Sequence, residues 1–337
     1  MGGFRVHGDF GKEIWLEYRH LGKSGVKVSE IALGSWLTYG GSVEEERARE
    51  CIHRAYELGI NFFDTANVYA QGAAEEIVGR ALKDFSRESY FLATKVYFPM
   101  GEGPNDRGLS RKHIVEQCHA SLRRLGVDYV DLYQCHRYDT ETPLEETLRA
   151  LDDLVRQGKV LYVGVSEWSA DQISDALKIA DEMGFDRIVS NQPRYNMIQR
   201  HIERRVMPLC EVEGVGQVVF SPLGQGVLTG KYRPGEAPAK GTRAANPEQS
   251  VFMRELMNES VLSAVEKLRG VASDLGLSMS QLALAWVLRR ENVSSAIIGA
   301  SRPEQVEDNV GASGVELSPE VLERIDGILS GVIQTGS

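Results

Sequence analysis

The sequence predicts one (β/α)8 barrel domain, a TIM barrel, over residues 1–337. Short apolar, β-rich segments alternate with amphipathic helical segments along nearly the whole chain. Several of these strands are apolar almost continuously, which is typical of parallel strands covered on both faces. The main alternative is a doubly wound sheet, but neither G-x-G-x-x-G nor an acidic ribose partner follows the first strand.

Eight segments are predicted as the barrel strands. They are residues 31–34, 60–64, 90–96, 129–136, 160–166, 188–192, 217–221 and 295–300. Helices are expected between them, and two carry clear boundary signals. Ser110 is a candidate N-cap for a helix that Gly126 ends, and Pro143 suits the first turn of a helix that ends near Gly158.

Two segments lie outside this alternation. Residues 1–29 precede the first barrel strand and are expected to form a capping hairpin with its turn at residues 22–25. Residues 223–257 form a long, Gly- and Pro-rich loop after the seventh strand. A loop of that length in a compact domain is usually functional or disordered, and its glycines suggest a partial lid over a cofactor.

Composition excludes several classes of protein. The chain has 38 Lys and Arg against 48 Asp and Glu, a formal net charge of −10, which argues against nucleic-acid or anionic-membrane partners. No apolar segment is long enough to span a bilayer, and the first residues lack the apolar core of a signal peptide. Oligomeric state stays open.

The four cysteines are Cys51, Cys118, Cys135 and Cys210, far apart and without metal-ligand spacing. They are interpreted as reduced thiols of a cytoplasmic protein, and no metal site is predicted. Cys135 adjoins His136, but alternation along a strand directs it toward the helices, which argues against a thiol nucleophile.

Polar side chains end three successive predicted strands. Asp64 ends the second strand, Lys95 lies near the end of the third, and His136 ends the fourth, while Tyr69 follows Asp64 in the next loop. The carboxyl ends of barrel strands share one face, where barrel enzymes carry their active sites. We therefore expect these four side chains to converge.

This set suits proton donation from a phenol. The ordinary pKa of Tyr is about 10. A Lys ammonium at about 4 Å favours the phenolate by up to ~4 kcal/mol, so Lys95 is expected to lower the pKa of Tyr69. Asp64 would hold Lys95 charged, and His136 would bind a substrate oxygen or relay a proton. A carbonyl protonated in this way also needs a hydride, which no side chain supplies, so a nicotinamide cofactor is implied.

At these residues the sequence resembles the aldo-keto reductases, in the branch that includes the bacterial potassium-channel-β-like reductases. The similarity lies in FDTANVYAQGAAEEIVGRAL, LATKV and YVDLYQCHRYD and extends from about residue 16 to the last helix. It implies a (β/α)8 barrel that binds NADP(H) without a Rossmann motif. It also implies that Asp64, Tyr69, Lys95 and His136 are a catalytic tetrad with Tyr69 as general acid and base.

The resemblance also implies cofactor-binding positions. Ser166 and Gln192 would bind the carboxamide, and Phe220 would stack on the nicotinamide ring. Near the pyrophosphate it places Ser221, Leu223, Gly224, Gln225, Gly226 and Lys231. At the adenosine end it places Gly299, Ser301, Arg302, Gln305, Asp308 and Asn309.

The adenosine positions depart from many relatives. Gln305 replaces a common Arg, and Asp308 replaces a commoner Glu. A guanidinium matches phosphate geometry, so Arg302 favours NADPH, while NADH stays open as the cofactor.

The resemblance further implies an aromatic substrate pocket. Its lining would be Trp36, Tyr39, Tyr97, Phe98, Arg137 and Trp168. Such a pocket suits a range of small aldehydes and ketones without selecting one. The tail after the last helix is too short for the long substrate loop of many relatives, which favours small polar aldehydes.

The expected activity is therefore NADPH-dependent reduction of small carbonyl compounds. One alternative is a nucleotide-binding, channel-β-like regulatory subunit with little turnover. Such subunits resemble the reductases but carry Asn at the position of His136, so the intact tetrad favours turnover. A weaker alternative is a lyase that forms a Schiff base on Lys95.

Overall fold

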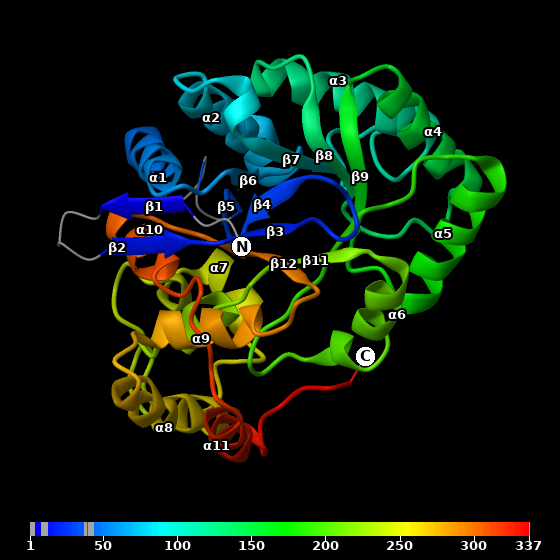
Figure 1. Ribbon diagram of the computed structural model, residues 1–337. Coiled ribbons are helices and arrows are strands. Elements are labelled where there is room, and N and C mark those ends of the chain that lie inside the picture. The colour runs from blue at the N-terminus through cyan, green and yellow to red at the C-terminus, as the bar shows by residue number, and fades with distance from the viewer. Residues whose placement is uncertain (1–3, 8–12, 37–38, 40–43, 337) are drawn as a thin grey trace.

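The computed structural model describes residues 4–7, 13–36, 39 and 44–336 and contains a closed barrel of eight parallel strands surrounded by helices (Figure 1). The strands follow the chain order, and the last pairs with the first to close the sheet. The predicted (β/α)8 fold is confirmed. The barrel strands are β5 (Ile31–Gly34), β6 (Phe62–Asp64), β7 (Phe91–Val96), β8 (Val130–Cys135), β9 (Val160–Ser166), β10 (Ser190–Gln192), β11 (Gly216–Val219) and β12 (Val293–Ile298).

The predicted strand boundaries need correction at several ends. β6 and β10 begin two residues later than expected, and β12 covers residues 293–298 in place of 295–300. β11 ends at Val219, and Phe220 forms only an isolated bridge to Arg194. The cause is local, because Ser221 has a φ of 57° and turns the chain away from the extended conformation.

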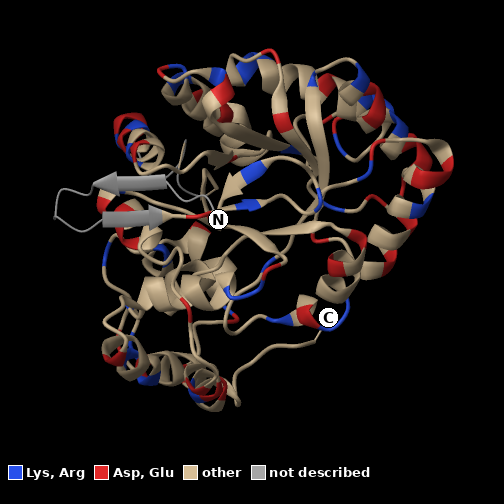
Figure 2. Ribbon diagram, viewed as in Figure 1, with Lys and Arg blue, Asp and Glu red and all other residues tan. Residues whose placement is uncertain are grey.

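The helices cover the outside of the barrel. They are α1 (Glu45–Glu57), α2 (Ala73–Leu82), α3 (Arg111–Leu125), α4 (Leu144–Arg156), α5 (Ala170–Met183), α6 (Val206–Glu213), α7 (Pro247–Ser250), α8 (Glu259–Asp274), α9 (Met279–Leu288), α10 (Pro303–Val310) and α11 (Pro319–Leu329). The predicted signals for α3 are confirmed, since the Ser110 hydroxyl accepts from the His113 amide and Gly126 ends the helix with a φ of 68°. Charged residues of both signs lie mainly on these outer helices and loops (Figure 2).

Two hairpins precede the barrel. β1 (Phe4–His7) pairs with β2 (Glu13–Leu16), and β3 (Tyr18–His20) pairs with β4 (Lys27–Ser29). The second is the expected capping hairpin with its turn near residues 22–25, whereas the first was not predicted. Residues 1–3 and 8–12 of the predicted capping segment lie outside the described residues.

The capping hairpin fills one end of the barrel interior. Leu21 and Val28 from the hairpin belong to a buried apolar cluster with inward-facing strand residues. The strand members are Ala32, Phe62, Phe91, Ala93, Leu132, Val218 and Ile297. Because this plug closes the amino-terminal end of the strands, a ligand has to approach from their carboxyl ends.

A larger apolar layer lies between the strands and the helices. Cys135 belongs to it, as alternation along the strand predicts, and burial raises the pKa of its thiol. All four cysteines are free and buried.

No single helix in the described part of the chain is both long and apolar enough to cross a membrane. The pair α8 and α9 reaches that length and composition together, but the two helices are bent by 88°.

The long loop after β11 has structure of its own. It contains the short 3-10 helices η4 (Gly224–Thr229), η5 (Arg243–Ala245) and η6 (Val251–Met253) together with α7. Met253 and Leu256 are buried in the outer core, which anchors the loop to the barrel.

Candidate active site

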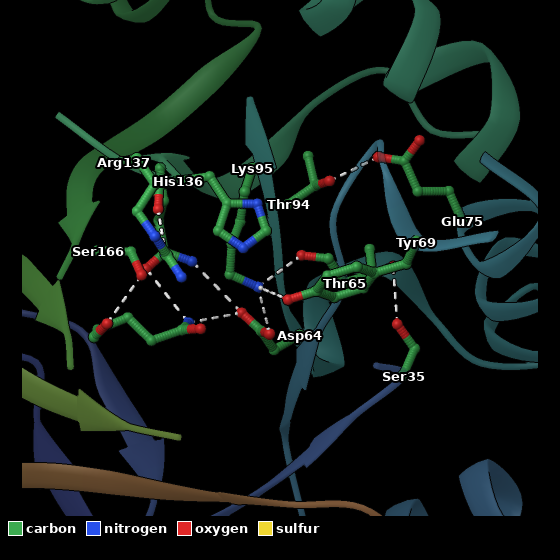
Figure 3. A network of polar contacts seen from close by, with 12 residues as sticks. Ser35, Asp64, Thr65, Tyr69, Glu75, Thr94, Lys95, His136, Arg137 and Ser166 are labelled. Atoms are coloured by element: carbon green, nitrogen blue, oxygen red, sulfur yellow. Dashed lines mark hydrogen bonds and ion pairs between the residues drawn. The ribbon is translucent and has the colours of Figure 1, made fainter. Parts of the chain in front are cut away.

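The four residues of the predicted tetrad lie together at the carboxyl ends of adjacent strands (Figure 3). Asp64 is the last residue of β6, Lys95 is the fifth of six residues in β7, and His136 directly follows β8. Parallel pairing sets Asp64 beside Ala93 and Lys95 beside Gln134, so the register itself brings the side chains to one place.

Lys95 is the centre of this group. Its side chain is fully buried, and its ammonium lies 2.5 Å from Asp64 Oδ2, 2.8 Å from the Thr65 carbonyl oxygen and 3.3 Å from Tyr69 Oη. An ammonium has three N–H donors, and these three acceptors use all of them. Because the Tyr69 oxygen accepts from Lys95, the Tyr69 hydroxyl proton is available for a different acceptor.

The electrostatic balance at Tyr69 differs from the sequence prediction. Burial raises the pKa of Tyr69, and the opposing charges of Lys95 and Arg137 do not reverse that direction. The expectation that Lys95 would lower this pKa below its ordinary value is wrong, since it left out the desolvation of the phenol. Burial disfavours the Lys95 ammonium too, but Asp64 outweighs this effect, and the pKa of Lys95 is raised.

His136 is neutral at physiological pH. Burial, helped by the nearby charges of Lys95 and Arg137, holds the pKa of His136 well below its ordinary value. Its ring lies 5.6 Å from the Tyr69 ring, edge to face, and its buried Nδ1 has no hydrogen-bond partner among the residues that the structure describes. A neutral imidazole at this place can donate or accept one hydrogen bond.

The loop that presents Tyr69 is conformationally unusual. The three residues after it, Ala70, Gln71 and Gly72, have φ values of 48°, 53° and 96°. Non-glycine residues adopt this region only where their surroundings enforce it. A Cβ on Gly72 would lie 2.7 Å from the Arg124 side chain, so the loop is packed tightly onto α3.

Glu75 supports this loop from the next helix. It is completely buried in α2 and accepts from the Thr94 hydroxyl at 2.5 Å and from Arg124 Nε at 2.6 Å. Thr94 directly precedes Lys95 in β7. The hydrogen bond between Thr94 and Glu75 therefore connects the strand of Lys95 with the helix after Tyr69 (Figure 3). Sequence reasoning did not single out Glu75 or Arg124.

A second set of hydrogen bonds reaches Asp64 from two further strands, β8 and β10. Asp64 Oδ1 accepts from Gln192 Nε2 at 2.9 Å and from Gln134 Nε2 at 3.3 Å, and the Ser166 hydroxyl donates to the Gln192 carbonyl at 2.8 Å. The structure thus brings Ser166 and Gln192 beside the predicted tetrad. Gln134 was not predicted, although it lies two residues before His136 and therefore on the same strand face.

The predicted nicotinamide and pyrophosphate positions lie along a sharply turning segment after β11. Ser221, Gln225 and the glycines at 224 and 226 all have positive φ values, between 54° and 94°. The Gln225 amide group and backbone N–H both donate to the Ser221 hydroxyl. Successive N–H groups in such turns can form an anion-binding concavity. Leu223 is partly buried and packs on the core.

Three cations gather near this turn. Arg243 donates a hydrogen bond to the Gln225 side chain. The Lys231 ammonium lies close to Gly226, since a Cβ atom added to this glycine would be 3.0 Å from it. Burial lowers the pKa of Lys231, and the charges of Arg243 and Arg302 lower it further. We call Lys231, Arg243 and Arg302 the cation cluster. Arg243 was not predicted, because it lies within the long loop, far in sequence from any motif.

The predicted adenosine positions surround the start of α10. The Gln305 side chain accepts from the Ser301 backbone N–H at 2.8 Å, and Arg302 is the exposed residue before the helix. Gly299 is exposed after β12, whereas Asn309 is buried. The Asp308 carboxylate accepts from Ser278 at the start of α9, so in this structure it joins two helices.

The predicted substrate-pocket residues divide into two groups. Trp36 lies 6.5 Å from the Tyr69 ring and 6.4 Å from the Phe220 ring, and Phe98 lies 4.9 Å from the His136 ring. Tyr97 contacts Phe98. Phe252, which was not predicted, covers Trp36 at 5.1 Å from within the long loop.

Tyr39 and Trp168 are buried and have other neighbours. Tyr39 is buried in the outer core, with its hydroxyl beside Cys51 of α1. Trp168 is buried against Tyr138, at 4.8 Å between ring centroids. Both aromatic side chains therefore pack in the core layer in this structure, and sequence position alone could not separate them from the rings around Tyr69.

A barrel that gathers polar side chains and aromatic rings at the carboxyl ends of its strands has the arrangement of a barrel enzyme, whose active site lies at this face. The Aldo/keto reductase family profile matches residues 30–330, and the chain belongs to this family. Membership supports a general oxidoreductase role and a nicotinamide cofactor.

Two plant proteins show strong similarity over nearly their whole length. A protein of Oryza sativa subsp. japonica, named "Probable voltage-gated potassium channel subunit beta", is 42% identical over 319 residues, which cover 93% of this chain and 97% of the relative. A protein of Arabidopsis thaliana with the same name is 43% identical over 319 residues, with the same coverage.

Proposed function

We propose that this protein reduces small aldehydes and ketones to alcohols with NADPH, and that Tyr69 supplies the proton. The observation that carries the proposal is the contact of 3.3 Å between Lys95 Nζ and Tyr69 Oη, with Asp64 at 2.5 Å on the other side of the ammonium. This arrangement orients the phenol and stabilises the negative charge that develops on it when its proton leaves.

The residues present fit a phosphate-bearing nicotinamide cofactor. The cation cluster concentrates three positive charges beside a turn rich in backbone N–H groups, and Arg302 precedes the N-terminus of α10. Lys231, Arg243 and Arg302 would hold its phosphates, while Ser166, Gln192 and Phe220 would hold the nicotinamide end. When bound, the cofactor supplies a hydride to the carbonyl carbon. We favour NADPH over NADH because the cation cluster provides more positive charge than a pyrophosphate alone requires.

The chain's own residues then complete the reaction at the carbonyl oxygen. A substrate oxygen near Tyr69 accepts the hydroxyl proton, and neutral His136 donates a hydrogen bond to the same oxygen. Lys95 stabilises the resulting phenolate, and the proton is restored from solvent. Trp36 and Phe98 exclude water from the reacting atoms.

The test is the oxidation of NADPH by purified protein with a panel of small aldehydes, repeated with NADH. Wild type should show aldehyde-dependent oxidation, and Tyr69→Phe should lose about 10³-fold in kcat while still binding NADPH, because general acid catalysis typically contributes about 10²–10⁴-fold. Equal turnover by Tyr69→Phe would contradict the role of the phenol. Equal use of both cofactors would contradict the NADPH preference.

A second candidate function is that of a nucleotide-binding channel-β-like subunit with little turnover. It is favoured by the names of the two plant relatives. Tight NADPH binding without turnover of any aldehyde would put this function ahead. His136 supports the reductase function, because the family resemblance implies Asn at this position in regulatory subunits of the channel-β type.

A further inference from the structure

Arg137 has a position and a charge that the proposed proton donation does not use. It follows His136 directly at the end of β8 and is half-buried. Its Nη1 donates to the His136 carbonyl at 2.5 Å, and its guanidinium carbon lies 5.6 Å from the centre of the Phe98 ring. Figure 3 includes Arg137 in the polar network around Lys95 and His136.

The charge of Arg137 acts on the reacting groups. It opposes the rise in the pKa of Tyr69 and contributes to the low pKa of His136, so its field reaches both side chains. The guanidinium therefore lies near the place where a substrate carbonyl would be protonated.

This guanidinium has no carboxylate partner in the described part of the chain. Within the described residues no Asp or Glu oxygen lies within 4.0 Å of Arg137, and the His136 carbonyl is its single hydrogen-bond acceptor. The other cations nearby are paired, since Lys95 binds Asp64 at 2.5 Å and Arg194 lies 3.8 Å from Glu255. Arg137 therefore adds a positive charge near Tyr69 that no carboxylate of the described residues contacts, although the whole chain carries a formal net charge of −10.

An unpaired charge is costly to withdraw from water, and a guanidinium has five N–H donors in a planar fork. The fork matches carboxylate and phosphate oxygens, which it can bind through two parallel hydrogen bonds. The Phe98 ring lies beside this guanidinium and the Trp36 ring lies beside Tyr69, so both limit the space at the strand ends and favour a short molecule.

We propose that the preferred substrates are short aldehydes that also carry a carboxylate or a phosphate, with the anionic group held by Arg137 while the carbonyl oxygen reaches Tyr69. This inference rests on the proposed reductase function. The reaction is unchanged by it: the aldehyde, NADPH and one proton give the primary alcohol and NADP+, and the anionic group takes no part in bond making or breaking.

The test compares kcat/KM within two matched pairs of substrates. The first pair is 4-oxobutanoate and its methyl ester, which differ in a carboxylate charge. The second is glycolaldehyde phosphate and glycolaldehyde, which differ in a phosphate. Wild type should prefer the anionic member at least tenfold in one pair, mainly through a lower KM, and the pair that shows the preference identifies the anion.

Variants assign the preference to Arg137. Arg137→Gln should reduce the anionic-to-neutral ratio to about one, and Arg137→Lys should retain part of it. Arg107→Gln is the matched control, because Arg107 is well exposed at 64% and lies near Glu141. It should keep the wild-type ratio. Added salt should lower the ratio in wild type but leave Arg137→Gln unaffected.

Two results would overturn the inference. One is a ratio near or below one in wild type for both pairs, and the other is a preference that persists in Arg137→Gln. If neutral aldehydes are reduced without any charge preference, the reductase function stands and the inference about Arg137 falls. If no aldehyde of either kind is reduced, the proposed function itself is wrong.

Discussion

The proposed catalytic group (Asp64, Tyr69, Lys95 and His136) and the cation cluster are built in opposite ways. Asp64, Lys95 and His136 lie in or directly beside three neighbouring strands, so strand register fixes their separations. Lys231 and Arg243 lie in a long loop and approach each other only through the turns and short helices of that loop. The first arrangement is rigid because the whole barrel supports it, whereas the second depends on a few local contacts.

The two regions also handle charge differently. In the catalytic group the buried cation has an anion at 2.5 Å, and both are fully hydrogen-bonded. In the cation cluster burial and the charges of Arg243 and Arg302 lower the pKa of Lys231, and among the described residues a carboxylate lies near Arg302 alone, with Glu304 at 3.9 Å. The comparison teaches that Lys95 and Asp64 stabilise each other within the protein, while the proposed role of the cluster is to bind an anionic ligand that would stabilise its charges.

The largest effect is expected at Lys95. Lys95→Met leaves Asp64 buried without its cation, and the free energy of unfolding should fall by about 3–5 kcal/mol, measured by urea denaturation. The double variant Asp64→Asn/Lys95→Met removes both charges and should recover part of this stability, but not the turnover. Equal instability of the single and double variants would show that the charge pair is not the cause.

A smaller effect is expected at Glu75, which supports the Tyr69 loop. Glu75→Gln leaves Arg124 without its carboxylate and should lower the free energy of unfolding by about 1–3 kcal/mol. The neighbour Glu76 is half exposed, so Glu76→Gln is the control and should change stability by less than about 0.5 kcal/mol. Similar losses in both variants would mean that the loop does not depend on the buried pair.

His136 should make stability depend on pH in the acidic range. Its pKa in the folded protein is lowered below its ordinary value of 6.5, so below that pH the unfolded chain takes up a proton that the folded protein does not. Stability should therefore fall as pH decreases from about 6.5, by up to about 1.4 kcal/mol per pH unit. The free energy of unfolding, measured by urea denaturation at about pH 7 and about pH 5, should differ less between the two pH values for His136→Asn than for wild type. An identical difference would contradict the burial of a neutral imidazole.

The cation cluster should affect cofactor affinity more than turnover. Arg243→Gln should raise the Kd for NADPH about tenfold, which corresponds to about 1.4 kcal/mol, by loss of one charge-assisted contact. Arg233→Gln, an exposed position in the same loop, is the control and should keep the wild-type Kd. A change in kcat with unaltered Kd would contradict this role for Arg243.

The long loop gives the smallest and most local test. Phe252 contacts Trp36 and Arg243 contacts Gln225, so the loop already folds back toward the strand ends. If it acts as a partial lid over the cofactor, saturating NADPH should slow hydrogen exchange within residues 223–257. Unchanged exchange in this segment would exclude a lid role.

Much of the barrel could be predicted from the sequence because its signals are local. Alternating strands and helices, the Ser110 cap and the Gly126 stop act within a few residues of one another. The convergence of Asp64, Lys95 and His136 follows from strand position alone, once the fold is known. The end of β11 was predicted less accurately, because the positive φ of a single residue, Ser221, determines where the strand ends.

The remaining features depend on contacts between distant parts of the chain. Glu75 and Arg124 are 49 residues apart, and Gln225 and Arg243 meet across a loop of irregular structure. Tyr39 and Trp168 resemble Trp36 in chemistry, yet both are buried in the outer core, whereas Trp36 contacts the Tyr69 ring.

The sequence by itself determined the barrel, the four polar residues at its strand ends and the need for a hydride donor, since periodicity and residue chemistry are properties of short segments. Only the tertiary structure decided the direction of the pKa shift at Tyr69 and the unpaired charge of Arg137. Desolvation and ion pairing depend on every group packed around a side chain, and these groups come from distant parts of the sequence.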